Sequence, residues 1–194
     1  MQPLCQITWA TPVGRIVAIE PRTDEVAHHA AQLAAAYNDP HNAPLLGHSE
    51  DVDEDDVADH YADVAEDGGH NFLVFLDGAL VADGDLRKVG GGAAEFAFMV
   101  AAPAAQGKGL GTRVALMIHG FGFARLGLER IYASIIPHNT ASRRVFEKLG
   151  YRVDDSPAAR AYADEPGDVT MVIDRAAFEA AHAAAMAEIE LTMR

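Results

Sequence analysis

The chain has 194 residues, of which 49% are hydrophobic, and a formal net charge of −14 at pH 7. This length and composition predict one α/β domain with a single substantial core over residues 1–194. No run reaches the roughly 18 apolar residues of a membrane span, and the first residues lack the basic start and apolar core of a secretory signal. We therefore expect a cytoplasmic protein with no membrane partner.

Cysteine and histidine usage argues against a metal site. The single cysteine, Cys5, cannot form an intramolecular disulfide; it could carry an acyl group, but a thiol near the N-terminus in a reducing cytosol is usually incidental. The nine histidines show no H-E-x-x-H spacing, and the adjacent His28 and His29 would point to different faces of a helix. We expect no metal ion.

The first 47 residues predict a strand, a helix and a loop. Residues 13–19 are rich in β-branched side chains, which favours a strand. A helix should begin near Thr23, because acids follow in its first turn, and should continue through the Ala-rich residues 27–37. A proline-containing stop follows, and residues 41–47 are expected to form a loop.

Residues 50–67 form an acidic segment with ten Asp or Glu and no Lys or Arg. Val57, Tyr61 and Val64 recur at helical spacing, so we expect a helix with one apolar stripe. Two interpretations stay open for its charge. The segment is either an acidic wall that attracts a cationic amine or the solvated helix face of a protein from an organism that favours acidic proteins.

Three strands are predicted next. Residues 72–76 and 79–87 form a hairpin, because the Asp-Gly pair between them is a preferred two-residue turn. A glycine turn at residues 90–92 leads into a strand over residues 94–100, which is apolar except for one carboxylate, Glu95.

A glycine-rich cluster follows this strand and opens a long, apolar-faced helix. Its glycines allow close backbone approach, and N–H groups at a helix N-terminus point outward at the positive end of the helix dipole. Lys108 adds a positive charge and Thr112 a hydroxyl, so we expect a phosphate or pyrophosphate cradle, with an ordinary glycine-rich helix start as the alternative. The segment does not match a Walker loop, because Gly109 stands where that motif needs Ser or Thr. It does not match the Rossmann fingerprint either, because Thr112 stands where the third glycine belongs. The cluster comprises Gln106, Gly107, Lys108, Gly109, Leu110, Gly111 and Thr112.

The remaining elements are a strand over residues 130–136, a helix over residues 139–149, a loop over residues 154–168 and a strand over residues 169–173. The Ala-rich residues 176–193 predict a C-terminal helix, which could pack on the body or supply a homodimer contact.

Two motifs at this separation resemble the GNAT (Gcn5-related N-acetyltransferase) superfamily. Residues 106–111 match every fixed position of its acetyl-CoA motif, Q/R-x-x-G-x-G/A. Asn139 and Ser142, followed by a closing Gly-Tyr pair, match its second signature. Over the core unit, residues 94–151, the order of elements looks most like the RimJ/RimL-type ribosomal-protein N-acetyltransferase branch.

The resemblance implies an α/β (α+β) GNAT fold, with a mixed, mostly antiparallel sheet of about six to seven strands flanked by helices. It also implies an N-acetyltransferase that moves an acetyl group from acetyl-CoA to a primary amine by direct attack in a ternary complex. Residues 103–160 hold nine Lys or Arg against four acids, which suits the polyanionic coenzyme A. On so acidic a protein this basic region is too modest to indicate nucleic-acid binding.

An alkyl amine, with a pKa near ~10.4, is protonated at neutral pH and needs a base before it can attack. Glu95 is the predicted base, because it is the ionisable side chain of an apolar strand and because the family often uses a glutamate there; the alternative is a solvated edge-strand carboxylate. Phe146 stands where many members carry a tyrosine that protonates the CoA thiolate. Ser142 is therefore the candidate acid, with a purely structural role at the helix start as its alternative.

The resemblance also assigns cofactor-binding residues. Residues 106–112 would hold the pyrophosphate through backbone N–H groups. Backbone groups of Met99 and Val100 would pair with the pantetheine arm, which places the Val100 N–H near the thioester carbonyl. Asn139 would hydrogen-bond the same arm, and it also suits a helix N-cap.

The acceptor amine is expected to be a protein N-terminus or a small cationic amine such as a polyamine, an aminoglycoside or an amino acid. Two alternatives to the acetyltransferase stay open. One is a catalytically silent acyl-CoA-binding or sensing module, which Phe146 permits and Glu95 opposes. The other is an acyltransferase that uses a longer acyl-CoA.

Overall fold

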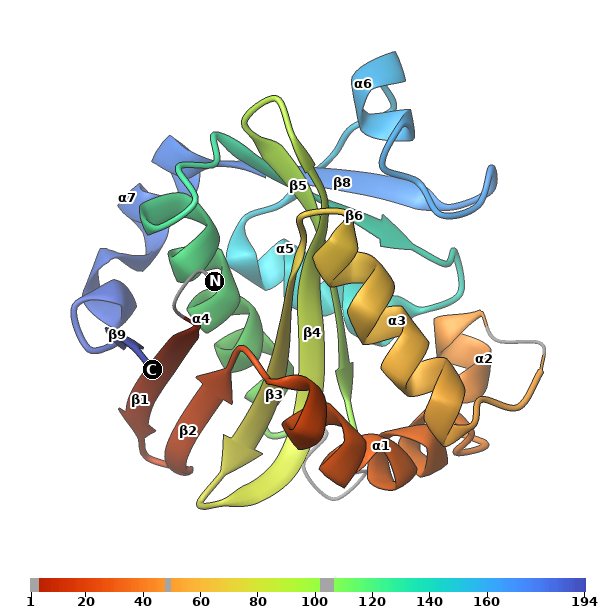
Figure 1. Cartoon of the computed structure of the whole chain (residues 1–194). Helices are drawn as coiled ribbons and strands as arrows, with labels where there is room; N and C mark the ends of the chain where they lie inside the picture. The colour runs from red at the N-terminus through yellow and green to blue at the C-terminus, as the bar shows by residue number, and fades with distance from the viewer. Residues whose placement is uncertain (1–3, 48–49, 102–106) are drawn as a thin grey trace.

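A nine-stranded sheet runs through the part of the chain that the computed structural model describes, residues 4–47, 50–101 and 107–194 (Figure 1). The strand order is β7-β8-β6-β5-β4-β3-β2-β1-β9. Neighbouring strands are antiparallel except β5 and β6, which are parallel, so the expected mixed, mostly antiparallel sheet is confirmed, with nine strands in place of the expected six to seven. The strands are β1 (Cys5–Thr11), β2 (Gly14–Ile19), β3 (His70–Leu76), β4 (Ala79–Gly90), β5 (Ala93–Val100), β6 (Arg130–Ile135), β7 (Arg152–Val153), β8 (Val169–Asp174) and β9 (Glu190–Met193).

Helices cover both faces of this sheet. On one face α4 packs against β4 and β5, with α5 and α7 beside it, and forms the main core. On the other face lie α1 and α3, which Figure 1 shows in front of β3 and β4. Val57, Tyr61 and Val64 of α3 are all buried, as their helical spacing predicts. The helices are α1 (Thr23–Tyr37), α2 (Ala43–Leu46), α3 (Glu54–Glu66), α4 (Leu110–Ala124), α5 (Thr140–Leu149), α6 (Pro157–Arg160) and α7 (Arg175–Met186).

Turn and cap chemistry fixes several of these elements where the sequence predicts them. The β3–β4 hairpin turns at Asp77 and Gly78, which both have positive φ, as the preferred Asp-Gly turn requires. The Asn139 side chain caps α5 by accepting a hydrogen bond from the Ser142 N–H at 2.9 Å. Gly150, with φ of 94°, ends the same helix in the left-handed conformation.

The sheet opens between β5 and β6. Their parallel pairing runs from Ala93 to Glu95 on β5 and ends there, although β5 itself continues to Val100. Beyond Glu95 the two strands separate, because β6 stays paired with β8 while β5 stays paired with β4. The separation exposes backbone and side chains of β5 from Phe96 to Val100 on the walls of two cavities.

The prediction of a C-terminal helix over residues 176–193 is wrong beyond Met186. Helix α7 loses regular geometry at His182, whose φ is −122°, and the last residues form β9 on the outer edge of β1. Pairing with β1, together with the hydrogen bond from Trp9 Nε1 to Glu188 Oε2 at 3.0 Å, outweighs the local helix propensity of this alanine-rich segment. The homodimer stays a prediction.

Four elements were not predicted from the sequence: β1, β7 and the short helices α2 and α6. The two helices lie in the expected loops 41–47 and 154–168. Each is short, and none carries a long periodic pattern. None of the described helices combines the length and the hydropathy needed to cross a membrane.

Candidate active site

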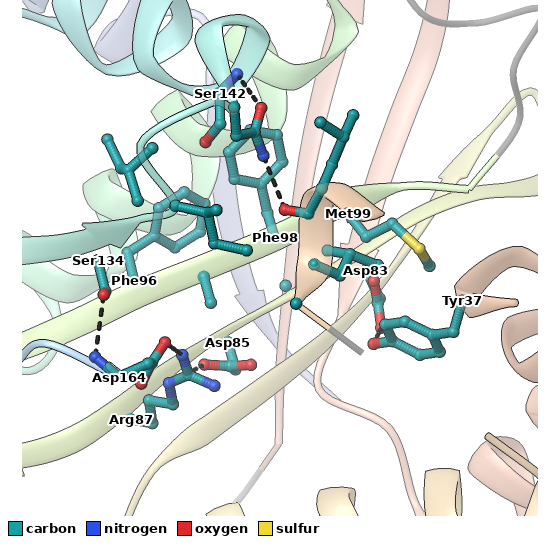
Figure 2. A pocket seen from close by; sticks show the side chains of 18 of the residues that line it. Tyr37, Asp83, Asp85, Arg87, Phe96, Phe98, Met99, Ser134, Ser142 and Asp164 are labelled. Atoms are coloured by element: carbon teal, nitrogen blue, oxygen red, sulfur yellow. Dashed lines mark hydrogen bonds and ion pairs between the residues drawn. The ribbon is translucent and has the colours of Figure 1, made fainter. Parts of the chain in front are cut away.

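Two cavities meet at the opening between β5 and β6. The larger, of about 550 Å³, lies between α1, α3 and the sheet, and Figure 2 shows the side chains that line it. Because it is lined by six Asp or Glu, we call it the acidic cavity. The second, of about 340 Å³, lies beside the glycine-rich segment 107–112, and we call it the cradle cavity. The residues common to both walls are Leu45, Leu46, Phe98, Met99, Asn139 and Ser142.

The glycine-rich segment takes the geometry of an anion cradle. Gly107 and Gly109 have φ of 74° and 75°, in the left-handed region that favours glycine, and Leu110 begins a helix of 15 residues. A Cβ on Gly111 would stand 3.0 Å from the Phe98 ring, so a glycine is needed for α4 to pack this closely on β5. Backbone N–H groups at this helix N-terminus therefore face a cavity suited to a phosphate.

Most of the predicted cofactor-binding residues line the cradle cavity, together with two cationic side chains, Arg144 and Lys148. Lys108 is not among its lining residues within the described chain, and Gln106 lies outside the described residues. The predicted residues that line the cavity are Met99, Val100, Gly107, Gly109, Leu110, Gly111, Thr112 and Asn139. The donor set of helix N-terminus and cations fits the pyrophosphate of coenzyme A.

Asn139 and Ser142 lie on the wall between the two cavities. Besides capping α5, Asn139 donates a hydrogen bond from Nδ2 to the Leu45 carbonyl at 2.9 Å, and so ties α2 to α5. Ser142 is half-buried and lines both cavities. Phe146 lines the acidic cavity alone; it is 2% exposed and packs edge-on against Phe96 and Phe98.

Glu95 lies away from these walls. Its side chain is fully buried, and it does not belong to the described residues that line either cavity. Arg87 donates to both carboxylate oxygens, Nε to Oε2 at 3.2 Å and Nη2 to Oε1 at 2.9 Å, and the Lys88 ammonium is 2.8 Å from Oε2. Burial raises the pKa of Glu95, against the opposing hydrogen bonds from Arg87 and Lys88. A base role for Glu95 stays a prediction that this geometry does not favour.

Two other carboxylates do face the acidic cavity. Asp83 and Asp85 on β4 are 4% and 6% exposed, and they lie opposite Met99 and Ala97 on β5. Asp83 Oδ2 accepts a hydrogen bond from the Tyr37 hydroxyl at 2.5 Å (Figure 2). It accepts a second one from the Tyr61 hydroxyl at 3.3 Å. Among the described atoms, Asp83 Oδ1 and Asp85 Oδ1 have no hydrogen-bond partner.

Burial governs the electrostatics of this group. It raises the pKa of Asp83 to about 6, with a further rise from neighbouring Asp85, while the hydroxyls of Tyr37 and Tyr61 oppose the rise. Burial also raises the pKa of both tyrosines well above the ordinary value, so they stay neutral donors. The hydrogen bond with Asp85, whose Oδ2 is 3.5 Å from His60 Nε2, raises the pKa of His60.

The sequence carried a signal for these carboxylates. Asp83 and Asp85 are two residues apart in a predicted strand, so they share one face of the sheet, and an apolar strand with two acids on one face is unusual. The acidic segment contributes little to this cavity: Asp56 lines it, whereas Asp59 and Asp63 are exposed. Within the described chain no group of three or more His, Cys, Asp or Glu could hold a metal ion.

Comparison with known proteins gives a family and a fold. The family model described as "Acetyltransferase (GNAT) domain" matches residues 20–152. Alpha/beta-tubulin-N-acetyltransferase 9 of Mus musculus is 38% identical over 58 residues, which are 30% of this chain and 24% of that protein. The human protein of the same name is 40% identical over 57 residues, 29% of this chain and 28% of its own length. The match therefore spans about a quarter of these relatives.

Among solved structures, RimJ of Mycobacterium smegmatis in complex with CoA-disulfide has a TM-score of 0.73 at 22% identity, with 97% of each chain covered. Aminoglycoside acetyltransferase AAC(6')-Ib in complex with coenzyme A has a TM-score of 0.67 at 19% identity, covering 91% of this chain and 98% of that one. At such identities these structures show that the fold is shared.

Proposed function

Because the chain belongs to the GNAT acetyltransferase family, we propose that it transfers an acetyl group from acetyl-CoA to a primary amine, which attacks directly while both substrates are bound. One observation carries this proposal: the cradle cavity and the acidic cavity share a wall at Phe98 and Met99. A thioester held along the end of β5 would lie within reach of an amine in the acidic cavity, and close placement of two reactants lowers the barrier to their reaction.

The chain's residues divide the work between the two cavities. N–H groups at the start of α4 would bind the pyrophosphate, with Arg144 and Lys148 neutralising phosphate charge. Acetyl-CoA, when bound, supplies the activated acetyl group. The backbone of Met99 and Val100 would orient the arm, and the Ser142 hydroxyl, which lies on the shared wall, would give a proton to the leaving sulfur.

The acidic cavity favours a cationic acceptor. Its basic lining residues, His60 and Arg87, each lie next to carboxylates. The acidic lining residues outnumber them, so the potential in the cavity is negative. Desolvated carboxylates attract an ammonium group more strongly than exposed ones do. The acidic lining residues are Asp56, Asp83, Asp85, Asp164, Glu165 and Asp168.

The first test is release of free thiol from acetyl-CoA against polyamines, aminoglycosides, amino acids and short peptides. We expect turnover with at least one class. Silence across the panel, with CoA still raising the melting temperature, would instead support a silent acyl-CoA-binding module. Faster release from a longer acyl-CoA would support the acyltransferase alternative.

Gly111→Ala tests the cradle separately. Its Cβ would meet the Phe98 ring at 3.0 Å, so we expect CoA binding about tenfold weaker, or about 1.4 kcal/mol. Gly90→Ala is the matched control, because a Cβ there meets nothing within 4 Å. Isothermal titration with CoA measures both variants, and equal affinities would remove the cradle from the proposal.

A further inference from the structure

We propose that Asp83 is the catalytic base of this site and that its free oxygen, Oδ1, takes the proton from the attacking amine. This inference rests on the proposed acetyl transfer and replaces Glu95 in the role that the sequence assigned to it. Three features of the described chain support it: the position of Asp83, the hydrogen bonds that it makes, and the contrast with Glu95.

The register of β4 and β5 places Asp83 next to the reaction centre. Asp83 lies opposite Met99, and Met99 belongs to the wall that the two cavities share. Glu95 is four residues from Met99 along β5, or about 13 Å at roughly 3.3 Å per residue. Proton transfer needs heavy atoms within about 3 Å, or one intervening water, so Asp83 is within reach of an amine at Met99 and Glu95 is not.

The hydrogen bonds of Asp83 leave one oxygen available. Tyr37 and Tyr61 both donate to Oδ2, which holds the carboxylate plane in place, while Oδ1 has no partner among the described atoms. A buried carboxylate oxygen without a donor is costly unless a ligand supplies one. An ammonium group in the acidic cavity is such a donor, and both carboxylate oxygens of Glu95 already receive N–H groups from Arg87.

The charged surroundings of Asp83 suit a base that works near neutral pH. Its own strand contributes Asp85 and Arg87, and α3 contributes His60 and Tyr61, while Tyr37 comes from α1. Burial and Asp85 raise the pKa of Asp83 to about 6 against the two tyrosines and His60. At pH 7 to 8 the group is therefore mostly ionised, yet more basic than an exposed aspartate, which is the balance that a general base requires.

The proposed step balances. An N–H bond of the ammonium breaks and its proton moves to Asp83 Oδ1, which leaves a lone pair on nitrogen. That pair forms the bond to the thioester carbonyl carbon, and collapse of the tetrahedral adduct breaks the C–S bond with its electron pair going to sulfur. The second N–H proton neutralises the thiolate, directly or through Ser142, to give free coenzyme A, and Asp83 returns its proton to solvent.

The test is kcat/KM as a function of pH, with the best amine from the panel. Wild type should lose activity about tenfold per pH unit below about 6. Asp83→Asn should lower kcat/KM by about 10²- to 10⁴-fold and abolish this acid limb. Asp59→Asn, the same change at an exposed site on α3, should match wild type. Glu95→Gln should keep the acid limb, whatever its effect on rate.

Tyr37→Phe and Tyr61→Phe keep the proposal testable if Asp83→Asn does not fold. Each removes a hydrogen bond that lowers the pKa of Asp83, so each should move the acid limb to higher pH. The inference about Asp83 would be overturned, with the proposed function intact, if Asp83→Asn kept near wild-type turnover and the acid limb of kcat/KM. It would also be overturned if the acid limb did not move in either tyrosine variant. A wild type silent with every amine would overturn the proposed function before any variant is made.

Discussion

The two ends of the β4–β5 pair hold buried carboxylates in opposite circumstances. At the closed end Glu95 is fully buried, and two cations, Arg87 and Lys88, neutralise it. At the open end Asp83 is 4% exposed, and its partners are neutral hydroxyls that leave one oxygen without a donor. Burial is nearly the same, so burial alone does not mark the reactive group; the missing counter-charge does.

The difference follows from what each carboxylate does for the fold. Glu95 sits where β5 and β6 are still hydrogen-bonded, and its ion pairs join β5 to Arg87 and Lys88 of β4, which in turn pair with Asp164. Asp83 sits beyond that pairing, beside a cavity, where an uncompensated charge lowers stability and is retained only if it serves a purpose. Substitutions at the two ends should therefore change stability in opposite directions.

Arg87→Met gives the largest expected change in stability. The variant keeps an unbranched apolar stem in place of the arginine stem but leaves Glu95 buried with Lys88 as its remaining cation. We expect the free energy of unfolding to fall by about 3 to 4 kcal/mol, as when one partner of a buried ion pair is removed. Urea unfolding at pH 7.5 measures the loss. The double variant Arg87→Met, Glu95→Gln should recover most of it, and a loss under about 1 kcal/mol would mean that this end is not held by charge.

Asp83→Asn should do the reverse and stabilise the protein at pH 8. Because the folded pKa of Asp83 is about 6 and its ordinary value is 3.8, the folded state holds a proton between these values that the unfolded state has released. The unfolding free energy of wild type therefore falls as pH rises from about 4 to 6, and stays lower above that window. Asp83→Asn has no carboxylate to ionise in the folded state, so it avoids this loss of stability. At about 1.4 kcal/mol per pKa unit, the rise from 3.8 to about 6 limits its gain in unfolding free energy at pH 8 to about 3 kcal/mol.

Urea unfolding of wild type and Asp83→Asn at pH 4, 5, 6 and 8 checks the sign. The difference between the two proteins should be smallest at pH 4, where folded Asp83 is protonated and unfolded Asp83 is close to its own midpoint of 3.8. Loss of turnover combined with a gain in stability would identify Asp83 as a group kept for chemistry. A variant that is less stable than wild type at pH 8 would instead make Asp83 part of the structural framework.

The local elements that carry the site could be predicted from the sequence. The strand that carries Glu95, the glycine-rich helix start and the Asn139 cap all rest on local chemistry: alternation, φ preference and side-chain capping. Motif spacing then gave the family, and family membership is confirmed by the match over residues 20–152. Each of these signals is contained within a short stretch of consecutive residues, so no tertiary information was needed to see it.

What the sequence did not give depends on contacts between distant residues. Arg87 and Lys88, the cations that pair with Glu95, also pair with Asp164, which is 69 residues from Glu95 in sequence. Asp83 meets Tyr37 from α1 and Tyr61 from α3. Strand β9 forms because β1 offers it an edge, against the helix propensity of the same residues. Whether a buried carboxylate is neutralised is decided by such contacts, and so the identity of the base could not be read from the motif.

Asp164→Asn gives the smallest expected effect and locates the boundary of the neutralised end. Asp164 pairs with Arg87 at 2.6 Å and with Lys88 at 3.1 Å, but its side chain is 43% exposed. Water already solvates such a pair, so we expect a loss of less than about 1 kcal/mol by urea unfolding. The acid limb of kcat/KM should stay near pH 6, because the largest shifts in the pKa of Asp83 come from burial, Tyr37, Asp85, His60 and Tyr61. A loss of unfolding free energy as large as that of Arg87→Met would instead make Asp164 part of the buried ion-pair network. The neutralised end of the β4–β5 pair would then reach the acidic cavity, which Asp164 lines.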